Sequence, residues 1–95
     1  YQASPLRTDT ANFALNVLST IMQKQTPMPH VIPTSAGVQL EWHEKDIDLE
    51  LHITAPFECQ VWFHDHRRPE VPETSASLTN DFTILKEPID LLNTR

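Results

Sequence analysis

The sequence has few of the residues that build redox, metal or phosphate-binding motifs. Its 95 residues include one cysteine, Cys59, and one glycine, Gly37. A lone cysteine makes neither an internal disulfide nor a C-x-x-C motif, so we interpret Cys59 as a small buried hydrophobe and favour a reducing cytoplasm over secretion. One glycine leaves no glycine-rich loop for a phosphate or an oxyanion, and no serine lies in a glycine-flanked elbow. We therefore predict no cofactor and no catalytic triad.

Basic residues and long apolar runs are also scarce. Lysine and arginine total 7 against 13 acidic residues, which gives a formal charge of -6. This charge repels nucleic acid, and the most basic stretch, residues 64–68, contains Asp65 and is soon followed by Glu70, which argues against direct nucleic-acid binding. No run approaches the ~20 apolar residues of a membrane span, and we see no signal peptide.

The composition, 39% apolar and 21% charged, is typical of a globular protein. We predict one α+β domain over residues 1–95, with an N-terminal helix packed on an antiparallel meander of three to five strands and a short C-terminal helix. The sequence starts at Tyr1 rather than methionine, so we expect that an N-terminal leader is missing.

The segment from Gly37 to Ile53 alternates apolar and polar residues, which predicts a β-hairpin with one buried face. The apolar positions are Val38, Leu40, Trp42, Ile47, Leu49, Leu51 and Ile53. Matching them across the hairpin pairs Trp42 with Ile47 and Leu40 with Leu49. The same register sets Glu41 opposite Asp48 and Gln39 opposite Glu50. Like charges across a ladder are destabilising, so this register indicates either screening by solvent and nearby lysine or histidine side chains, or a basic partner.

The flanking segments predict further elements. A helix is expected from about Thr10 to Gln23, capped by Thr8 or Asp9. The helix has a broad apolar arc and carries no charged side chain from Thr10 to Gln23, so we expect it to pack between the sheet and either a second copy, in a homodimer, or the terminal helix. Further predictions are an edge segment over Pro27–Pro33, a strand from Cys59 to Asp65 with Cys59, Val61 and Phe63 inward, a short strand over Ser75–Leu78, and a helix built on Phe82, Leu85, Ile89 and Leu92. Pro88 either lies in the first turn of that helix or kinks it.

Several short motifs occur in order along residues 1–55. They are a Tyr-x-Ala-x-Pro leader at Tyr1, Ala3 and Pro5, a helix motif over Ala11–Leu18, Pro27 and Pro29, G-V-Q-L-E-W-H over Gly37–His43, and L-E-L over Leu49–Leu51. Together they resemble a family of small uncharacterised bacterial proteins in which Trp-Asp usually precedes the leader and glycine stands in place of Gln2. The resemblance implies a bacterial origin and brings no established activity.

The polar side of the predicted sheet carries the candidate functional residues. We predict that Trp62 is an aromatic anchor within an acidic rim that binds a protein partner, as in an antitoxin-like or accessory protein. The predicted partner-binding residues are Gln39, Glu41, His43, Asp48, Glu50, His52, Trp62 and His64. Whether the terminal helix covers Trp62 is left open.

A second hypothesis is a small metal-dependent or acid–base enzyme that uses the same face. Its metal ligands would be His43, His64 and His66, with His52 as another candidate. Such loose spacing is more typical of solvated histidines. A buried cleft joining His43, His64 and Glu41 would favour the enzyme, and a flat or convex face would favour binding.

Overall fold

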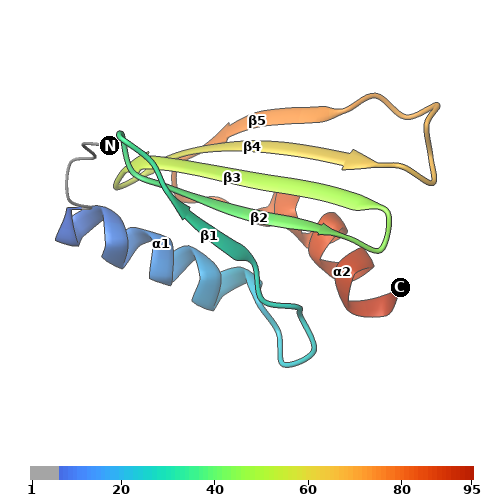
Figure 1. The fold of residues 1–95 in the computed structure, drawn as a ribbon, viewed down its shortest axis with the longest axis horizontal. Coiled ribbons are helices and arrows are strands. Elements are labelled where there is room, and N and C mark those ends of the chain that lie inside the picture. The colour runs from blue at the N-terminus through green and yellow to red at the C-terminus, as the bar shows by residue number, and fades with distance from the viewer. Residues whose placement is uncertain (1–6) are drawn as a thin grey trace.

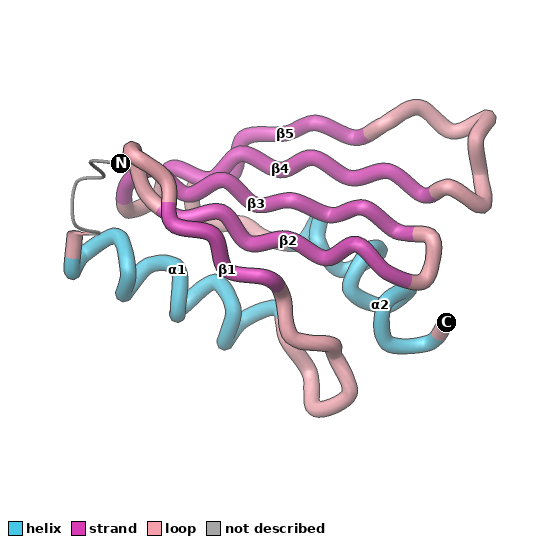
Figure 2. The backbone as a smooth tube through the Cα atoms, viewed as in Figure 1, coloured by secondary structure: helices cyan, strands magenta, loops and turns pink. Residues whose placement is uncertain are grey.

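Five antiparallel strands form one sheet in sequence order, and a helix lies before and after it in the chain (Figure 1). The computed structural model describes residues 7–95, so the leader motif at Tyr1, Ala3 and Pro5 lies outside the described residues. The elements are α1 (Thr8–Ile21), β1 (His30–Pro33), β2 (Val38–Glu44), β3 (Ile47–Ala55), β4 (Glu58–Asp65), β5 (Thr74–Leu78), a 3-10 turn η1 (Thr83–Leu85) and α2 (Lys86–Thr94). The predicted α+β class is confirmed, with β1 and β5 at the two edges (Figure 2).

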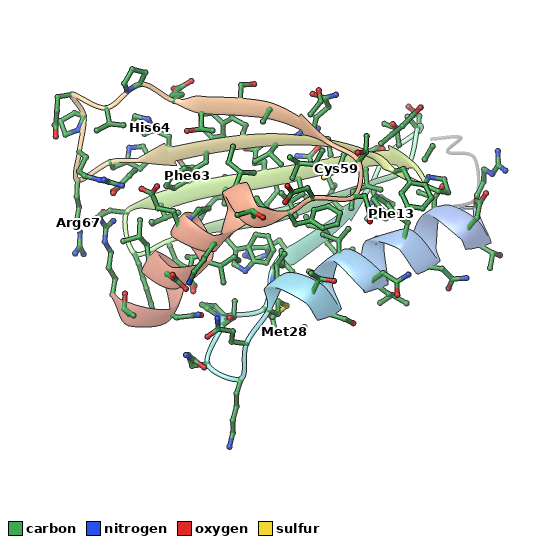
Figure 3. The ribbon with its side chains drawn as sticks, turned by 180° about the vertical axis from the view of Figure 1, so that it is seen from behind. Phe13, Met28, Cys59, Phe63, His64 and Arg67 are labelled. Carbon is green, nitrogen blue, oxygen red and sulfur yellow. The ribbon has the colours of Figure 1, made fainter. Side chains whose placement is uncertain are left out.

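Both helices pack on the same face of the sheet, and one hydrophobic core lies between the two layers. Alternate residues of β2, β3 and β4 point into this core because side chains alternate along a strand. Figure 3 views the molecule from the helix side and labels Phe13 of α1 and Cys59 and Phe63 of β4, which all belong to this core. The prediction that Cys59, Val61 and Phe63 point inward is confirmed by their burial.

The register of the central hairpin differs from the prediction by two residues. Trp42 lies opposite Leu49, rather than Ile47, and Leu40 lies opposite Leu51. The turn consists of Lys45 and Asp46, both with positive φ, at 56° and 61°. A two-residue hairpin turn of this kind matches the twist of the strands, and aspartate tolerates the left-handed conformation. An even shift keeps every side chain on its predicted face.

Gly37, just before β2, lies against the backbone of β3. A Cβ atom at this position would lie 2.0 Å from the carbonyl oxygen of Ile53, and Gly37 does not have a positive φ. A side chain at this position would force the backbone to shift, and glycine avoids this.

The first helix begins and ends about two residues earlier than predicted. Arg7 is the N-cap and makes no side-chain cap bond, so the predicted capping by Thr8 or Asp9 is wrong. Both residues lie inside the first turn, where the carboxylate of Asp9 accepts a hydrogen bond from the amide of Thr10 at 2.8 Å. Leu15 is 61% exposed, so within the described residues the sheet covers one side of α1 and leaves part of its apolar arc open.

The second helix begins at Lys86, so Pro88 lies in its first turn, which was one of the two predicted positions. Leu85, Ile89 and Leu92 are buried against the sheet. At the other end of α2, the Nζ of Lys45 donates to the carbonyl oxygen of Leu92 at 2.6 Å. A cation at this position satisfies one of the free carbonyl groups that end a helix.

A buried ion pair fixes the chain end to the sheet. Asp65, at the end of β4, is 6% exposed. Its two carboxylate oxygens accept hydrogen bonds from Arg95 at 2.7 and 2.8 Å, and Arg68 donates to one of them at 2.9 Å. The Arg95 guanidinium, which contributes most, holds the pKa of the Asp65 carboxyl well below its usual range. This cluster joins β4, the following loop and the end of α2.

Candidate functional site

All of the predicted partner-binding residues lie on the face of the sheet opposite the helices, which we call the open face. Residues directly opposite each other on a ladder share a face, and the pairings place them in three rows. The rows are Gln39, His52 and Gln60; Glu41, Glu50 and Trp62; and His43, Asp48 and His64. No helix among the described residues covers this face, so α2 does not hide Trp62, whose side chain is partly exposed.

The observed register changes which charges oppose each other. Glu41 lies opposite Glu50 rather than Asp48, while Asp48 lies opposite His43 and Gln39 lies opposite His52. One like-charged pair therefore remains at the centre of the open face. Asp48 gains an imidazole partner that the predicted register did not give it.

Asp48 is held between two histidines. Its Oδ1 lies 2.6 Å from Nδ1 of His43, and its Oδ2 lies 2.5 Å from Nε2 of His66. Partial burial tends to raise the pKa of Asp48, but the hydrogen bonds from His43 and His66 outweigh it and the pKa is lowered. The pKa of His43 is raised, mainly by the hydrogen bond to Asp48 and then by the one to Glu41. The open face therefore tends to hold His43 as an imidazolium between carboxylates.

The two opposed glutamates also have polar neighbours. Nε2 of His43 lies 2.9 Å from Oε1 of Glu41 and 3.8 Å from Oε2 of Glu50. His52 contacts the other oxygen of Glu50, Oε1, at 3.1 Å. The side-chain amide of Gln39 donates to Oε2 of Glu41.

Trp62 lies at the β5 side of the open face and makes a polar contact that the sequence did not predict. Its Nε1 donates to a carboxylate oxygen of Glu73 at 2.9 Å, and its ring stacks near His64 at a centroid distance of 6.4 Å. Glu73 lies in the loop before β5, where no periodicity indicates a direction, so sequence patterns gave no signal for it. Nδ1 of His64 is buried without a hydrogen-bond partner, 4.0 Å from Glu73.

The histidines of the metal hypothesis are neighbours, but they do not form one group of donor atoms. His43 and His66 are joined through Asp48, and the rings of His64 and His66 lie 4.5 Å apart in an edge-on contact. Within residues 7–95, the donor atoms that come within 4.8 Å of one another belong instead to Glu41, His43 and Glu50.

A shallow pocket of about 270 Å³ lies next to the hairpin turn. Its lining includes His43, Asp48 and His66, but neither Glu41 nor His64 lines it. This pocket therefore does not join the residues that the enzyme hypothesis required to meet in a cleft.

Comparison with known proteins finds no family model, no curated protein and no solved structure that matches the chain. The resemblance to a bacterial family therefore stays a prediction. No helix within residues 7–95 has the length and apolar character needed to cross a lipid bilayer.

Proposed function

We propose that the protein is a non-enzymatic interaction module that binds a basic protein partner through the open face of its sheet. The observation that carries the proposal is the placement of three carboxylates, Glu41, Asp48 and Glu50, beside Trp62 on one face that the helices leave uncovered. An aromatic side chain inside a charged rim is common at binding hot spots. A partner of this kind would suit an antitoxin-like protein or an accessory subunit.

The charge of the chain supports a cationic partner. The formal charge is -6, and a negative surface attracts a basic protein and speeds its association. A partner's lysine or arginine placed between Glu41 and Glu50 would also remove the repulsion across their ladder. The complex should therefore weaken as the salt concentration rises.

The test is capture of the tagged chain's partner from the cytosol of the native organism, followed by measurement of the affinity of the purified pair. We expect a basic protein. Replacing both Glu41 and Glu50 by glutamine, or Trp62 by alanine, should weaken binding by about tenfold or more, as expected for hot-spot residues.

The matched control is the double variant Asp9→Asn and Glu70→Gln, which removes the same charge away from the open face. It should change the affinity by less than about threefold, because exposed distant charges act weakly. An acidic partner, or equal losses in control and open-face variants, would contradict the proposal.

The enzyme alternative uses the same histidines and carboxylates, and the structure offers it less support. Acid–base catalysis needs a site that encloses its substrate. The pocket beside His43 is shallow, and its lining omits Glu41 and His64. We therefore favour binding over catalysis.

A homodimer through α1 is a separate proposal. Leu15 is 61% exposed on the side of α1 away from the sheet, and a second copy would bury it. Light scattering across a range of concentrations should then show a dimer that Leu15→Gln converts to a monomer. A monomer at every concentration would rule the dimer out.

A further inference from the structure

Glu41, His43 and Glu50 bring three donor atoms close together on the open face. These atoms are Oε1 of Glu41, Nε2 of His43 and Oε2 of Glu50, and the donor atoms of the three residues lie within 4.8 Å of one another. Nε2 of His43 is 2.9 Å from the first oxygen and 3.8 Å from the second. Ligands about 2.1 Å from a tetrahedral zinc ion lie about 3.4 Å apart, which falls between these two distances.

The remaining nitrogen of His43 is already bonded on the far side of its ring. Nδ1 of His43 donates to Oδ1 of Asp48 at 2.6 Å, and His66 holds the other oxygen of Asp48 at 2.5 Å. A carboxylate behind the imidazole fixes the ring so that Nε2 faces the glutamates. Metal-binding histidines have the same arrangement, in which the second nitrogen donates to a carboxylate.

The two glutamates are held in the same way. Oε2 of Glu41 accepts from the side-chain amide of Gln39, and Oε1 of Glu50 contacts Nε2 of His52 at 3.1 Å. Each of the three residues therefore uses one polar atom for a neighbour outside the trio, while its other polar atom lies beside the other two residues. Outer hydrogen bonds of this kind hold the ligands of metal sites in position.

We propose that Glu41, His43 and Glu50 bind a divalent transition-metal ion of the zinc type. Two carboxylates and a neutral imidazole carry a charge of −2 that balances such an ion, and the ion removes the repulsion between Glu41 and Glu50. An imidazole ligand favours zinc and its neighbours over calcium or magnesium, which prefer oxygen ligands. The ion takes the place of the proton that His43 shares with Glu41, and that proton passes to the solvent.

Three protein ligands leave a fourth position of a tetrahedral ion for water or for an outside group. The site faces the solvent on the open face, because the side chain of His43 is 40% exposed. A metal ion here needs no protein partner, so zinc titration of the free chain tests this proposal separately from the proposed function, in which a partner's cationic side chain would compete with the ion for Glu41 and Glu50.

The experiment is a calorimetric titration of the full chain with zinc chloride alone, together with melting curves with and without zinc. We expect one ion per chain and a melting temperature that rises with zinc. His43→Gln and Glu50→Gln should each weaken zinc binding by about tenfold or more. Asp48→Asn should weaken it by about tenfold, as expected when the group behind a histidine ligand is lost.

Two controls separate this site from adventitious binding to histidines or surface carboxylates. His30→Gln removes another histidine and Glu70→Gln another carboxylate, and both should leave the zinc affinity unchanged. In zinc-free buffer, Glu50→Gln should unfold in one cooperative transition close to that of the wild type, which shows that this variant folds. No binding, or an equal loss in His30→Gln and His43→Gln, overturns the proposal.

Discussion

Cys59 is a buried hydrophobe rather than a reactive thiol. The residue is 1% exposed, and burial raises the pKa of its thiol to about 11. Because the thiolate is the reactive form, burial and the raised pKa both slow its chemistry. We expect Ellman's reagent at pH 8 to react with native protein only as fast as it unfolds, and with protein in urea at once. Rapid reaction of the native protein would contradict this.

A substitution at Gly37 tests how closely the chain before β2 approaches β3. Gly37→Ala places a Cβ atom 2.0 Å from the carbonyl oxygen of Ile53, which the backbone of β3 holds in place. The free energy of unfolding should fall by about 1–3 kcal/mol, as for overpacking elsewhere in proteins. Urea denaturation measures the change. The neighbouring Ser35→Ala, at an exposed position, should change it by less than about 0.5 kcal/mol, and stabilisation by Gly37→Ala would refute the argument.

At the level of the hairpin, two substitutions of Asp46 test whether the positive φ of the turn residues sets the register. Its φ of 61° is accessible to aspartate, but a β-branched side chain pays a steric penalty there. Asp46→Val should therefore destabilise the protein by about 1–2 kcal/mol. Asp46→Asn keeps the left-handed preference and loses only the exposed ion pair with Arg67, so a change within about 0.5 kcal/mol is expected. Chemical denaturation compares the two, and equal effects would contradict this role for the turn.

The same hairpin shows what the sequence could and could not predict. Alternation placed Leu40 and Leu49 on one face correctly, because burial follows a period of two. It could not choose between registers two residues apart, since both match apolar residues across the ladder. The choice depends on which residues adopt positive φ, and Lys45 gives no sequence signal for that.

For the candidate site, the sequence predicted which face of the sheet carries the residues but not the contacts between them. The side of the sheet that carries Glu41 and Trp62 followed from alternation alone. The link from His66 to Asp48 depends on the pairing of β3 with β4 and on a turn after β4, and the contact of Trp62 with Glu73 depends on the path of a loop. These contacts join residues far apart in the chain, so no local pattern encodes them.

At the scale of the whole molecule, Arg95 after α2 pairs with Asp65 at the end of β4, and this ion pair also lay beyond sequence reasoning. Arg95 and Asp65 are 30 residues apart, and their contact needs α2 to pack across the sheet. Asp65→Asn leaves Arg95, whose side chain is 14% exposed, without its partner. The free energy of unfolding at pH 7 should fall by about 3 kcal/mol, the low end of the range for breaking a buried pair. Urea denaturation measures it.

The pH dependence gives a second test of Asp65. Its pKa is lower in the folded than in the unfolded state, so the unfolded chain binds the proton first and acid destabilises the fold. The stabilisation is complete above the unfolded value of about 3.9 and is lost as the pH falls towards the folded value. The difference between wild type and Asp65→Asn should therefore be constant from pH 7 to 5 and shrink below pH 4. A constant difference at pH 3 would contradict this. The control Asp9→Asn, on the surface of α1, should show little difference at any pH.

The division of the sheet into a helix-covered side and an open side also affects how the sequence of such a protein can evolve. Stability rests mainly on one set of alternating positions in β2, β3 and β4, and surface chemistry rests on the other. Substitutions in the second set leave the packing intact, so they accumulate at little cost in folding. Relatives that share this architecture can therefore diverge in what they recognise while their buried residues stay alike.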